Sequence, residues 1–253
     1  MTESYEKIRK MDDRKAEILE AVINRYIRTA EPVGSKVIAE EYDLGVSPAT
    51  IRSEMAALEE MGYLVQPHTS AGRAPTDKGY RFYVDSLRKI LALSAGDASS
   101  LREKLAELRR LEVEDMLRQI AGMLASRTAS VSIILTPGSH RRVYFWGVSH
   151  ILHQPEFIDL KRFEPLMELL ENEYTLAEWL TEEVSEPQVH VRIGSENRHE
   201  ELSQMSLVAA GYKMDEEAPG IVCLLGPTRM DYETAIPIVD FTARNLSRIV
   251  RDE

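Results

Sequence analysis

The sequence predicts an α+β protein with two blocks, an N-terminal winged helix-turn-helix domain and a C-terminal domain in which helices pack on a sheet. Two observations lead to this prediction. Residues 1–90 contain three helix-like segments followed by a short hairpin-like segment. Residues 101–253 begin with a segment that suits a long helix and then combine strand-like runs with helical ones. The small, polar residues 91–100 are expected to form a linker between these domains.

The helices of the first block have local start and stop signals. The first helix is expected over residues 14–28, because its apolar positions recur at helical spacing and Pro32 follows. Ser35 can cap a short second helix that ends near residue 42. The third helix is expected over residues 48–60. Its cap would be Ser47, whose hydroxyl can accept a free amide, and the proline that follows needs no partner in a first turn.

A hairpin is expected directly after the third helix. Residues 63–66 suit a short strand, TSAG suits the tip, and residues 73–76 suit the returning arm. Thr76 can then cap a fourth helix. Three helices and such a hairpin make a winged helix-turn-helix. In that fold the helix after the turn enters the major groove, and the hairpin reaches flanking phosphates or the minor groove.

The third helix has an apolar side and a small, sparsely charged side. If Ile51 and Leu58 face the core, helical geometry turns Arg52 and Ser53 outward, with Thr50 beside them. An ordinary amphipathic helix could show the same pattern. The turn before this helix and the hairpin after it favour the interpretation as a DNA-recognition helix. Arg52 can offer a bidentate fork to guanine. The residues expected to contact DNA from this helix are Ser47, Ala49, Thr50, Arg52 and Ser53.

The net charge of −11 argues against nucleic acid at first sight, but the acidic residues are unevenly distributed. Residues 1–90 hold 14 basic and 15 acidic side chains, whereas the rest of the chain holds 17 and 27. Between residues 62 and 81 the single acid is Asp77, so this stretch is a local basic strip. The residues expected to contact the DNA backbone from the hairpin and the fourth helix are His68, Thr69, Ser70, Arg73, Lys78 and Arg81.

The second block is expected to contain five strands and several helices. The segment from Leu101 suits a long helix, which either packs on its own domain or forms a dimer seam, and both interpretations stay open. Later helices are expected near residues 160–180 and 232–249. The expected strands cover residues 131–135, 143–146, 189–193, 206–212 and 221–225.

Candidate enzyme and metal signals are weak. His150, His153 and Glu156 have a spacing that would suit zinc on one helix, but Pro155 argues against a continuous helix there. HEXXH, a phosphate-binding GxxxxGK[ST] loop and GxSxG are absent from the sequence. No enzyme activity, cofactor or metal is therefore expected, and a zinc hydrolase is kept only as a third hypothesis.

The composition also limits which disulfides, membrane spans and cellular compartment can be expected. Cys223 is the single cysteine, so the chain can form no internal disulfide and no zinc cluster built on cysteines. No apolar run is long enough to span a membrane, and the start, MTESYEKIRKMDDRK, lacks an apolar signal region. The cytoplasm is the expected compartment.

Several motifs carry a family resemblance. EPVGS, SPATIR, TSAGRAPTDKGYR, QPEF and GPTRMDY occur within stretches that together cover most of the chain. In these stretches and their order the sequence closely resembles the heat-inducible transcription repressors called HrcA. The resemblance implies a winged-helix domain followed by a GAF-like domain. It also implies a dimeric repressor that binds an inverted-repeat operator upstream of chaperonin and chaperone operons, with activity supported by the GroE chaperonin.

The sequence departs from the family pattern at one place. Family members usually carry an inserted module that contributes to dimerisation, whereas TPGSHRRVYFWG passes here from one expected strand to the next. The family's dimer interface is therefore in question for this chain, while the DNA-binding domain is unaffected. An alternative hypothesis keeps that domain and makes the GAF-like domain a small-molecule sensor. Within the two motifs of the second block, QPEF and GPTRMDY, we expect structural roles. Thr228 would cap the last helix, with Asp231 three residues on as the second member of a short variant of the capping box. Arg229 would pair with an acid or contact another subunit.

Overall fold

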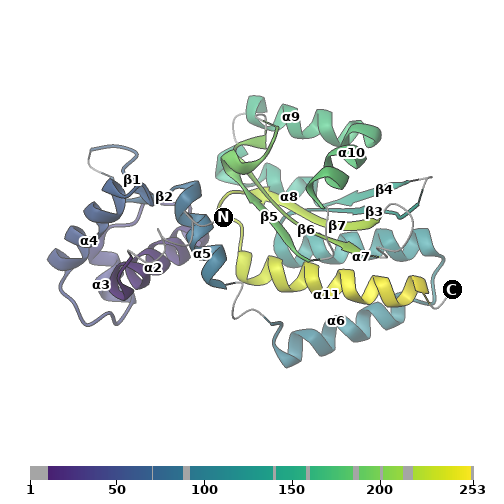
Figure 1. Ribbon diagram of the computed structural model, residues 1–253, viewed down its shortest axis with the longest axis horizontal. Coiled ribbons are helices and arrows are strands. Elements are labelled where there is room, and N and C mark those ends of the chain that lie inside the picture. Colours follow the sequence, from purple (N-terminus) through teal and green to yellow (C-terminus); the bar gives the residue numbers. More distant parts are fainter. Residues whose placement is uncertain are drawn as a thin grey trace. The chain divides into compact units, whose positions relative to one another are not determined.

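The chain folds into two compact units, Met1–Lys89 and Ile90–Glu253 (Figure 1). The computed structural model describes residues 11–69, 71–87, 92–138, 141–157, 160–184, 188–199, 202–212 and 219–251. None of the helices in these ranges combines the length and the apolar character needed to cross a membrane.

Unit 1 contains α2 (Asp13–Thr29), α3 (Ser35–Glu41), α4 (Pro48–Glu60) and α5 (Asp77–Leu87). Ser47 caps α4 as expected, because its Oγ accepts a hydrogen bond from the backbone N–H of Thr50 at 3.2 Å. The prediction for α3 is wrong by one residue, since Gly34 takes the cap position. Thr76 Oγ1 accepts from the N–H of Gly79 at 3.2 Å and so supports the start of α5.

The wing is a short antiparallel hairpin of β1 (Leu64–Val65) and β2 (Ala74–Pro75). Its inner side is closed by a bridge in which Val33 and Arg73 exchange two backbone hydrogen bonds of 2.8 and 2.9 Å. Gly72 permits this contact, because a Cβ at that position would lie 2.4 Å from the carbonyl carbon and oxygen of Val33. The wing is therefore joined to the segment between α2 and α3.

The apolar side of α4 packs into the core of unit 1 as the sequence predicts. Ile51, Met55 and Leu58 are buried, and Ile18 and Ile38 on the neighbouring helices are fully buried as well. Burying an aliphatic side chain of this size stabilises the fold by about 1.5–3 kcal/mol. The position of the opposite side of α4 is thus fixed by its own core residues.

Unit 2 begins with two helices, α6 (Ala95–Leu108) and α7 (Val113–Thr128), so the prediction of one long helix is wrong. Arg109 caps the end of α6, and the chain turns before α7. α6 also begins inside the stretch that was expected to be a linker. Its cap is Ser94, which accepts from the N–H of Asp97 at 3.0 Å, and Asp97 itself lies in the first turn.

A five-stranded antiparallel sheet forms the centre of unit 2, in the order β4-β3-β7-β6-β5. The segments expected at 131–135 and 143–146 have the bounds that the sequence predicts, and the other three differ only at their ends. The strands are β3 (Val131–Leu135), β4 (Val143–Trp146), β5 (His190–Ile193), β6 (Met205–Tyr212) and β7 (Gly220–Pro227).

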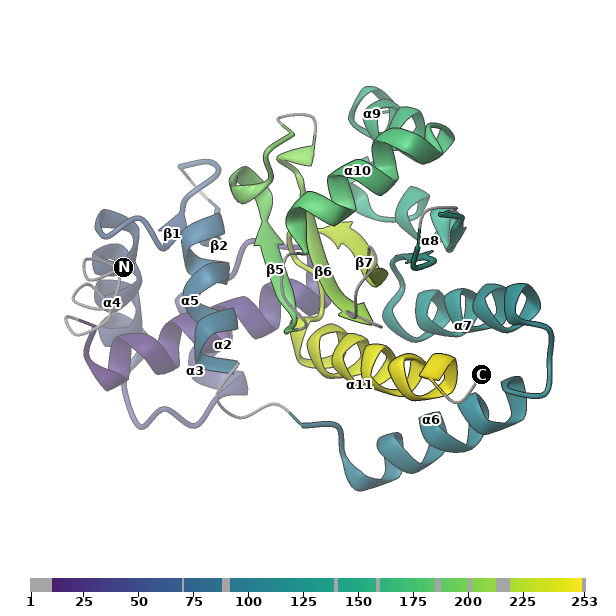
Figure 2. The ribbon, with the colours of Figure 1, turned by 45° about the vertical axis from the view of Figure 1, so that its right-hand side comes forward.

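Helices cover both faces of this sheet (Figure 2). α7 and α11 (Tyr232–Arg251) lie on one face. The other face packs against α8 (Val148–Leu152), the short turn η1 (Pro155–Phe157), α9 (Leu160–Glu171) and α10 (Glu173–Glu183). The expected helix over 160–180 is divided at Asn172, whose Oδ1 accepts from the N–H of Thr175 at 3.1 Å. β6 and β7 are buried along their whole length.

Candidate nucleic-acid interface

The outward side of α4 has the small residues that the sequence predicts there. Ala49, Arg52 and Ser53 are exposed, and Thr50 is half-buried. The Oγ1 of Thr50 lies 3.0 Å from Ser47 Oγ, so both hydroxyls take part in the helix cap. Arg52 makes no ion pair within the residues that the structure describes. Its guanidinium is therefore available to a base edge or a phosphate.

The tip of the wing is held by one glutamine. Gln66 Nε2 donates to the carbonyl oxygens of Thr69 and Ala71 at 3.1 and 3.0 Å, and Ala71 N–H donates to His68 O at 2.9 Å. His68 and Thr69 are exposed at this tip, as expected. Ser70 lies outside the described residues, so its predicted contact stays a prediction. Gln66 was not among the expected site residues.

Arg73 points toward the α4 side of the wing and pairs with an acid. Its Nε lies 2.8 Å from Glu59 Oε2, and its side chain is 19% exposed. The other oxygen of Glu59 accepts the N–H of Gln66 at 3.2 Å. Glu59 therefore joins the end of α4 to both arms of the wing. The expected direct contact of Arg73 with a phosphate would require this ion pair to open.

Lys78 and Arg81 also have partners inside unit 1. Lys78 Nζ donates to the carbonyl oxygen of Met61 and lies 4.2 Å from the centre of the Tyr63 ring. A lysine at the carbonyl end of a helix is favourable, because it satisfies a free acceptor and complements the helix dipole. Arg81 Nη1 lies 3.5 Å from Asp85 Oδ1. The Arg81–Asp85 pair is partly exposed, and such pairs are weak, so a phosphate can compete for the Arg81 guanidinium.

A hollow of about 390 Å³ lies between the start of α3, the middle of α4 and the wing. It brings Arg52, Thr69 and Arg73 to one concave surface, although they come from different elements. Arg52 and Arg73 thus line the same hollow, as a shared duplex-binding surface requires. The lining is formed by Val33, Gly34, Ser35, Arg52, Met55, Gln66, Thr69, Ala71, Gly72 and Arg73.

A charged side chain of α2, Lys15, contacts α4. Lys15 Nζ lies 2.9 Å from Glu54 Oε2 and 2.6 Å from Asp12 Oδ2. Hydrogen bonds from Lys15 lower the pKa of Asp12, and those with Asp12 and Glu54 raise the pKa of Lys15. Burial raises the pKa of Tyr63, whose ring packs under Lys78. Of these contacts, the Lys15–Glu54 ion pair joins α2 directly to α4.

The motifs QPEF and GPTRMDY meet in unit 2, where Arg229 pairs with an acid as expected. Its Nε lies 2.5 Å from Glu156 Oε1, and its Nη2 contacts Gln154 Oε1. The cap prediction is corrected, because Asp231 Oδ1, not Thr228, accepts from the N–H of Thr234 at 3.2 Å.

The residues of the zinc hypothesis have other contacts. His153 Nδ1 lies 2.6 Å from the carbonyl oxygen of Ser149, and the carboxylate of Glu156 forms an ion pair with the guanidinium of Arg229. Pro155 begins a separate 3-10 turn after α8, so a continuous helix does not present the three side chains together. Across the described part of the chain, no cluster of three or more His, Cys, Asp or Glu side chains could hold a metal ion.

Comparison with known families covers both units. Residues 10–86 match the family described as "Winged helix-turn-helix transcription repressor, HrcA DNA-binding", and residues 84–236 match "HrcA protein C terminal domain". One solved structure, described as a hypothetical protein, has a similar fold with a TM-score of 0.80 at 20% identity, covering 96% of this chain and 99% of that one.

Curated relatives match along nearly the whole chain. The heat-inducible transcription repressor HrcA of Pelotomaculum thermopropionicum is 32% identical over 339 positions, covering 95% of this chain and 97% of the relative. That of Symbiobacterium thermophilum is 32% identical over 338 positions, covering 95% and 99%. Because these alignments are longer than the 253 residues of the chain, the relatives contain segments without a counterpart here. The chain belongs to the HrcA family of heat-inducible transcription repressors.

Proposed function

We propose that this repressor binds an inverted-repeat operator as a homodimer and blocks transcription of chaperonin and chaperone operons by occupying their promoter. The winged-helix family match supports DNA binding. The relatives' description as heat-inducible repressors supports a heat-shock regulon. A two-fold symmetric protein matches a two-fold symmetric site, because each winged helix then reads one half-site.

The observation that carries the proposal is the open side of α4 above the hollow. Arg52 is exposed there without an ion pair in the described ranges, and small residues beside it allow close approach to a groove. In this arrangement Arg52 reads a guanine, and Thr50 and Ser53 bond a base or a phosphate. His68 and Thr69 at the wing tip contact the backbone or the minor groove.

The wing arginine has a different task from Arg52. Because Glu59 holds Arg73 at the edge of the hollow, Arg73 keeps the wing at a fixed distance from α4 and adds positive potential near the DNA. Lys78 and Arg81 exchange their internal partners for phosphates at the flank of the site. Specificity therefore resides in α4, and the wing contributes mainly general affinity.

The family resemblance further supports regulation by the GroE chaperonin in the cytoplasm. Chaperonin that is free of unfolded protein would keep the repressor in its DNA-binding form, and heat stress would withdraw that support. The alternative of a small-molecule sensor gains no support from the comparisons. A thermal-shift screen separates the two, since a ligand that binds the folded domain raises its melting temperature.

The experiment that tests the DNA-binding proposal compares three variants on the operator and on a scrambled duplex, by fluorescence anisotropy at several salt concentrations. Arg52→Ala should reduce the preference for the operator by about 1–3 kcal/mol. Arg52→Lys keeps the charge but loses the fork, so it should lose preference while keeping the salt slope. Arg73→Ala should weaken binding to both duplexes equally, because it removes positive charge near both and leaves the Glu59 carboxylate unpaired beside the DNA.

Equal losses on both duplexes for the Arg52 and Arg73 variants would refute this division of labour. Lack of any operator preference in the unmodified chain would refute the proposed function. Adding chaperonin with and without an unfolded protein tests the regulatory part, and an operator affinity that ignores both additions contradicts it.

A further inference from the structure

β4 is an edge strand of the sheet in unit 2, and its side chains are unusual for an edge. The sheet order leaves β4 paired with β3 on one side only. Its sequence is VYFW, without charge, proline or glycine. Soluble proteins normally protect an edge with charged side chains, proline or a bulge, because an open edge pairs with other strands. The opposite edge strand, β5, carries His190 and Arg192.

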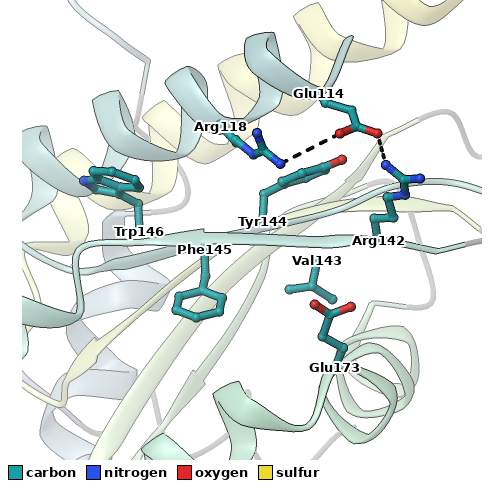
Figure 3. Close-up of a pocket in the computed structure, with 8 residues that line it drawn as sticks. All are labelled: Glu114, Arg118, Arg142, Val143, Tyr144, Phe145, Trp146 and Glu173. Atoms are coloured by element: carbon teal, nitrogen blue, oxygen red, sulfur yellow. Dashed lines mark ion pairs between the residues drawn. The ribbon is translucent and has the colours of Figure 1, made fainter.

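The side chains of β4 project to both faces of the sheet (Figure 3). Val143 and Phe145 point toward the α10 side, and Tyr144 and Trp146 point toward α7. Phe145 is 41% exposed and Trp146 is 58% exposed. The indole of Trp146 rests over Gly122 of α7, so its position is supported although much of its surface meets solvent. Large aromatic surface at a regular edge is typical of a protein contact.

Balanced charges surround this strand. A hollow of about 470 Å³ along β4 is lined by two acids, Glu114 and Glu173, and two arginines, Arg118 and Arg142, besides the strand itself. Arg142 pairs with Glu114, and the guanidinium of Arg118 lies 5.6 Å from the centre of the Tyr144 ring. A surface with equal positive and negative charge can meet its own copy without net repulsion.

We propose that β4 pairs antiparallel with β4 of a second copy of this chain, so that the two sheets join into one across a two-fold axis. The proposal rests on the dimer of the proposed function and identifies the surface that forms it. A two-fold axis perpendicular to the sheet makes the pairing antiparallel and keeps each side chain on the same face as its copy. A register centred on Phe145 stacks Phe145 on its copy and sets Tyr144 beside the partner's Trp146.

The size of the contact sets its strength. A strand of four residues is short, and a contact built on it is small beside the roughly 800 Å² per partner that stable complexes bury. We therefore expect micromolar self-association, which an inverted-repeat operator strengthens because the second winged helix binds at high effective concentration.

The experiment uses the native tryptophans as reporters of self-association. The chain has two, and Trp179 is 2% exposed, so the Trp179→Phe variant leaves Trp146 as the single reporter. Sedimentation equilibrium and tryptophan emission are recorded over the same dilution series. We expect the mass to double with concentration while the Trp146 emission shifts to the blue and becomes protected from iodide. If Trp179→Phe does not fold, the difference between the unmodified chain and Trp146→Phe gives the same signal.

Phe145→Lys should remain monomeric over the whole series, because it places a charge in the centre of the pairing edge. Val65→Lys is the matched control, since Val65 is a strand residue of similar exposure, 44%, in unit 1, and it should dimerise normally. Circular dichroism melting confirms that both variants are folded. Dimerisation of folded Phe145→Lys, or a mass that doubles without any change at Trp146, would overturn the proposal.

Failure of this proposal is distinguishable from failure of the proposed function. On a duplex with a single half-site Phe145→Lys should bind like the unmodified chain, and on the full operator it should lose the added affinity. An unmodified chain that dimerises through Trp146 but shows no operator preference contradicts the function alone. A chain that prefers the operator while folded Phe145→Lys still dimerises contradicts the interface alone.

Discussion

The wing of unit 1 and the edge strand β4 of unit 2 are both short β structures at the surface of their units. They differ in whether other backbone or side-chain groups cover their edges. The wing is joined to Val33 by a backbone bridge and to α4 through Glu59. β4 has apolar side chains on both faces and ends its sheet. A closed hairpin can meet a partner only through its side chains, whereas an open edge strand also offers its backbone hydrogen-bonding groups.

The largest effect is expected from breaking the closure of the wing. Gly72→Ala places a Cβ 2.4 Å from the backbone of Val33, which cannot move without opening the bridge. We expect a loss of about 1–3 kcal/mol in the free energy of unfolding of unit 1, measured by urea denaturation. Gly34→Ala is the control, because no atom lies within 4 Å of its added Cβ, and as an unfavourable helix cap it should cost less than about 1 kcal/mol. Equal losses would contradict the close approach at Gly72.

A smaller effect should follow from loosening the wing without opening it. Glu59→Gln removes the ion pair with Arg73 and leaves an oxygen for the Gln66 amide. Stability should fall by about 1 kcal/mol or less, since such pairs are partly screened. DNA affinity at low salt should rise, and the salt slope should steepen by about one unit, because Arg73 is then free for a phosphate. An unchanged slope in anisotropy titrations would show that Arg73 keeps its position without Glu59.

A third prediction tests how closely the indole of Trp146 packs on α7 at Gly122. Gly122→Ala adds a Cβ 3.8 Å from the indole, an ordinary contact distance, in the interior of α7. We expect a gain of up to about 1 kcal/mol in the free energy of unfolding, because alanine favours the helix. Dimerisation should stay unchanged. A destabilised protein in urea titrations would mean that Trp146 packs more tightly on α7 than it does here.

The smallest effect concerns the charges behind α4. Hydrogen bonds from Lys15 hold the pKa of Asp12 below its usual range, so the carboxylate stabilises the fold above the ordinary pKa of aspartate. That contribution is lost as the pH falls through the lowered pKa. Asp12→Asn keeps the helix cap and removes the titration. Urea denaturation should show a small difference between the two proteins at neutral pH that disappears in acid, and a difference that grows in acid would contradict this sign.

Elements with local signals could be predicted from the sequence. The cap at Ser47, the burial of Ile51 and Leu58, and the strands over 131–135 and 143–146 follow from hydroxyl chemistry and apolar spacing. The turn between α6 and α7 has no glycine or proline to mark it, so the apolar pattern continues through the break. The break at Asn172 did have a signal, because asparagine is a favoured helix cap.

The candidate site could be predicted only in part, for a similar reason. Helical spacing placed Arg52 on the outer side of α4, which depends on one element. The pairing of Arg73 with Glu59 depends on how the wing folds back on α4, and sequence spacing does not reveal it. Basic composition alone therefore assigned Arg73, Lys78 and Arg81 to phosphate contacts, although each has a partner within the fold.

The order of the strands affects how the chain can fold while it is being synthesised. β7 pairs with both β3 and β6, yet it follows them in the chain, with Leu225 opposite Val131. During synthesis the β3–β4 hairpin emerges early and must wait for residues from the last part of the chain before its inner edge is covered. Unit 1 meets no such delay, because its helices and wing come from one continuous segment. We therefore expect unit 1 to fold during synthesis before the sheet of unit 2, whose β3 strand keeps one edge uncovered until β7 emerges.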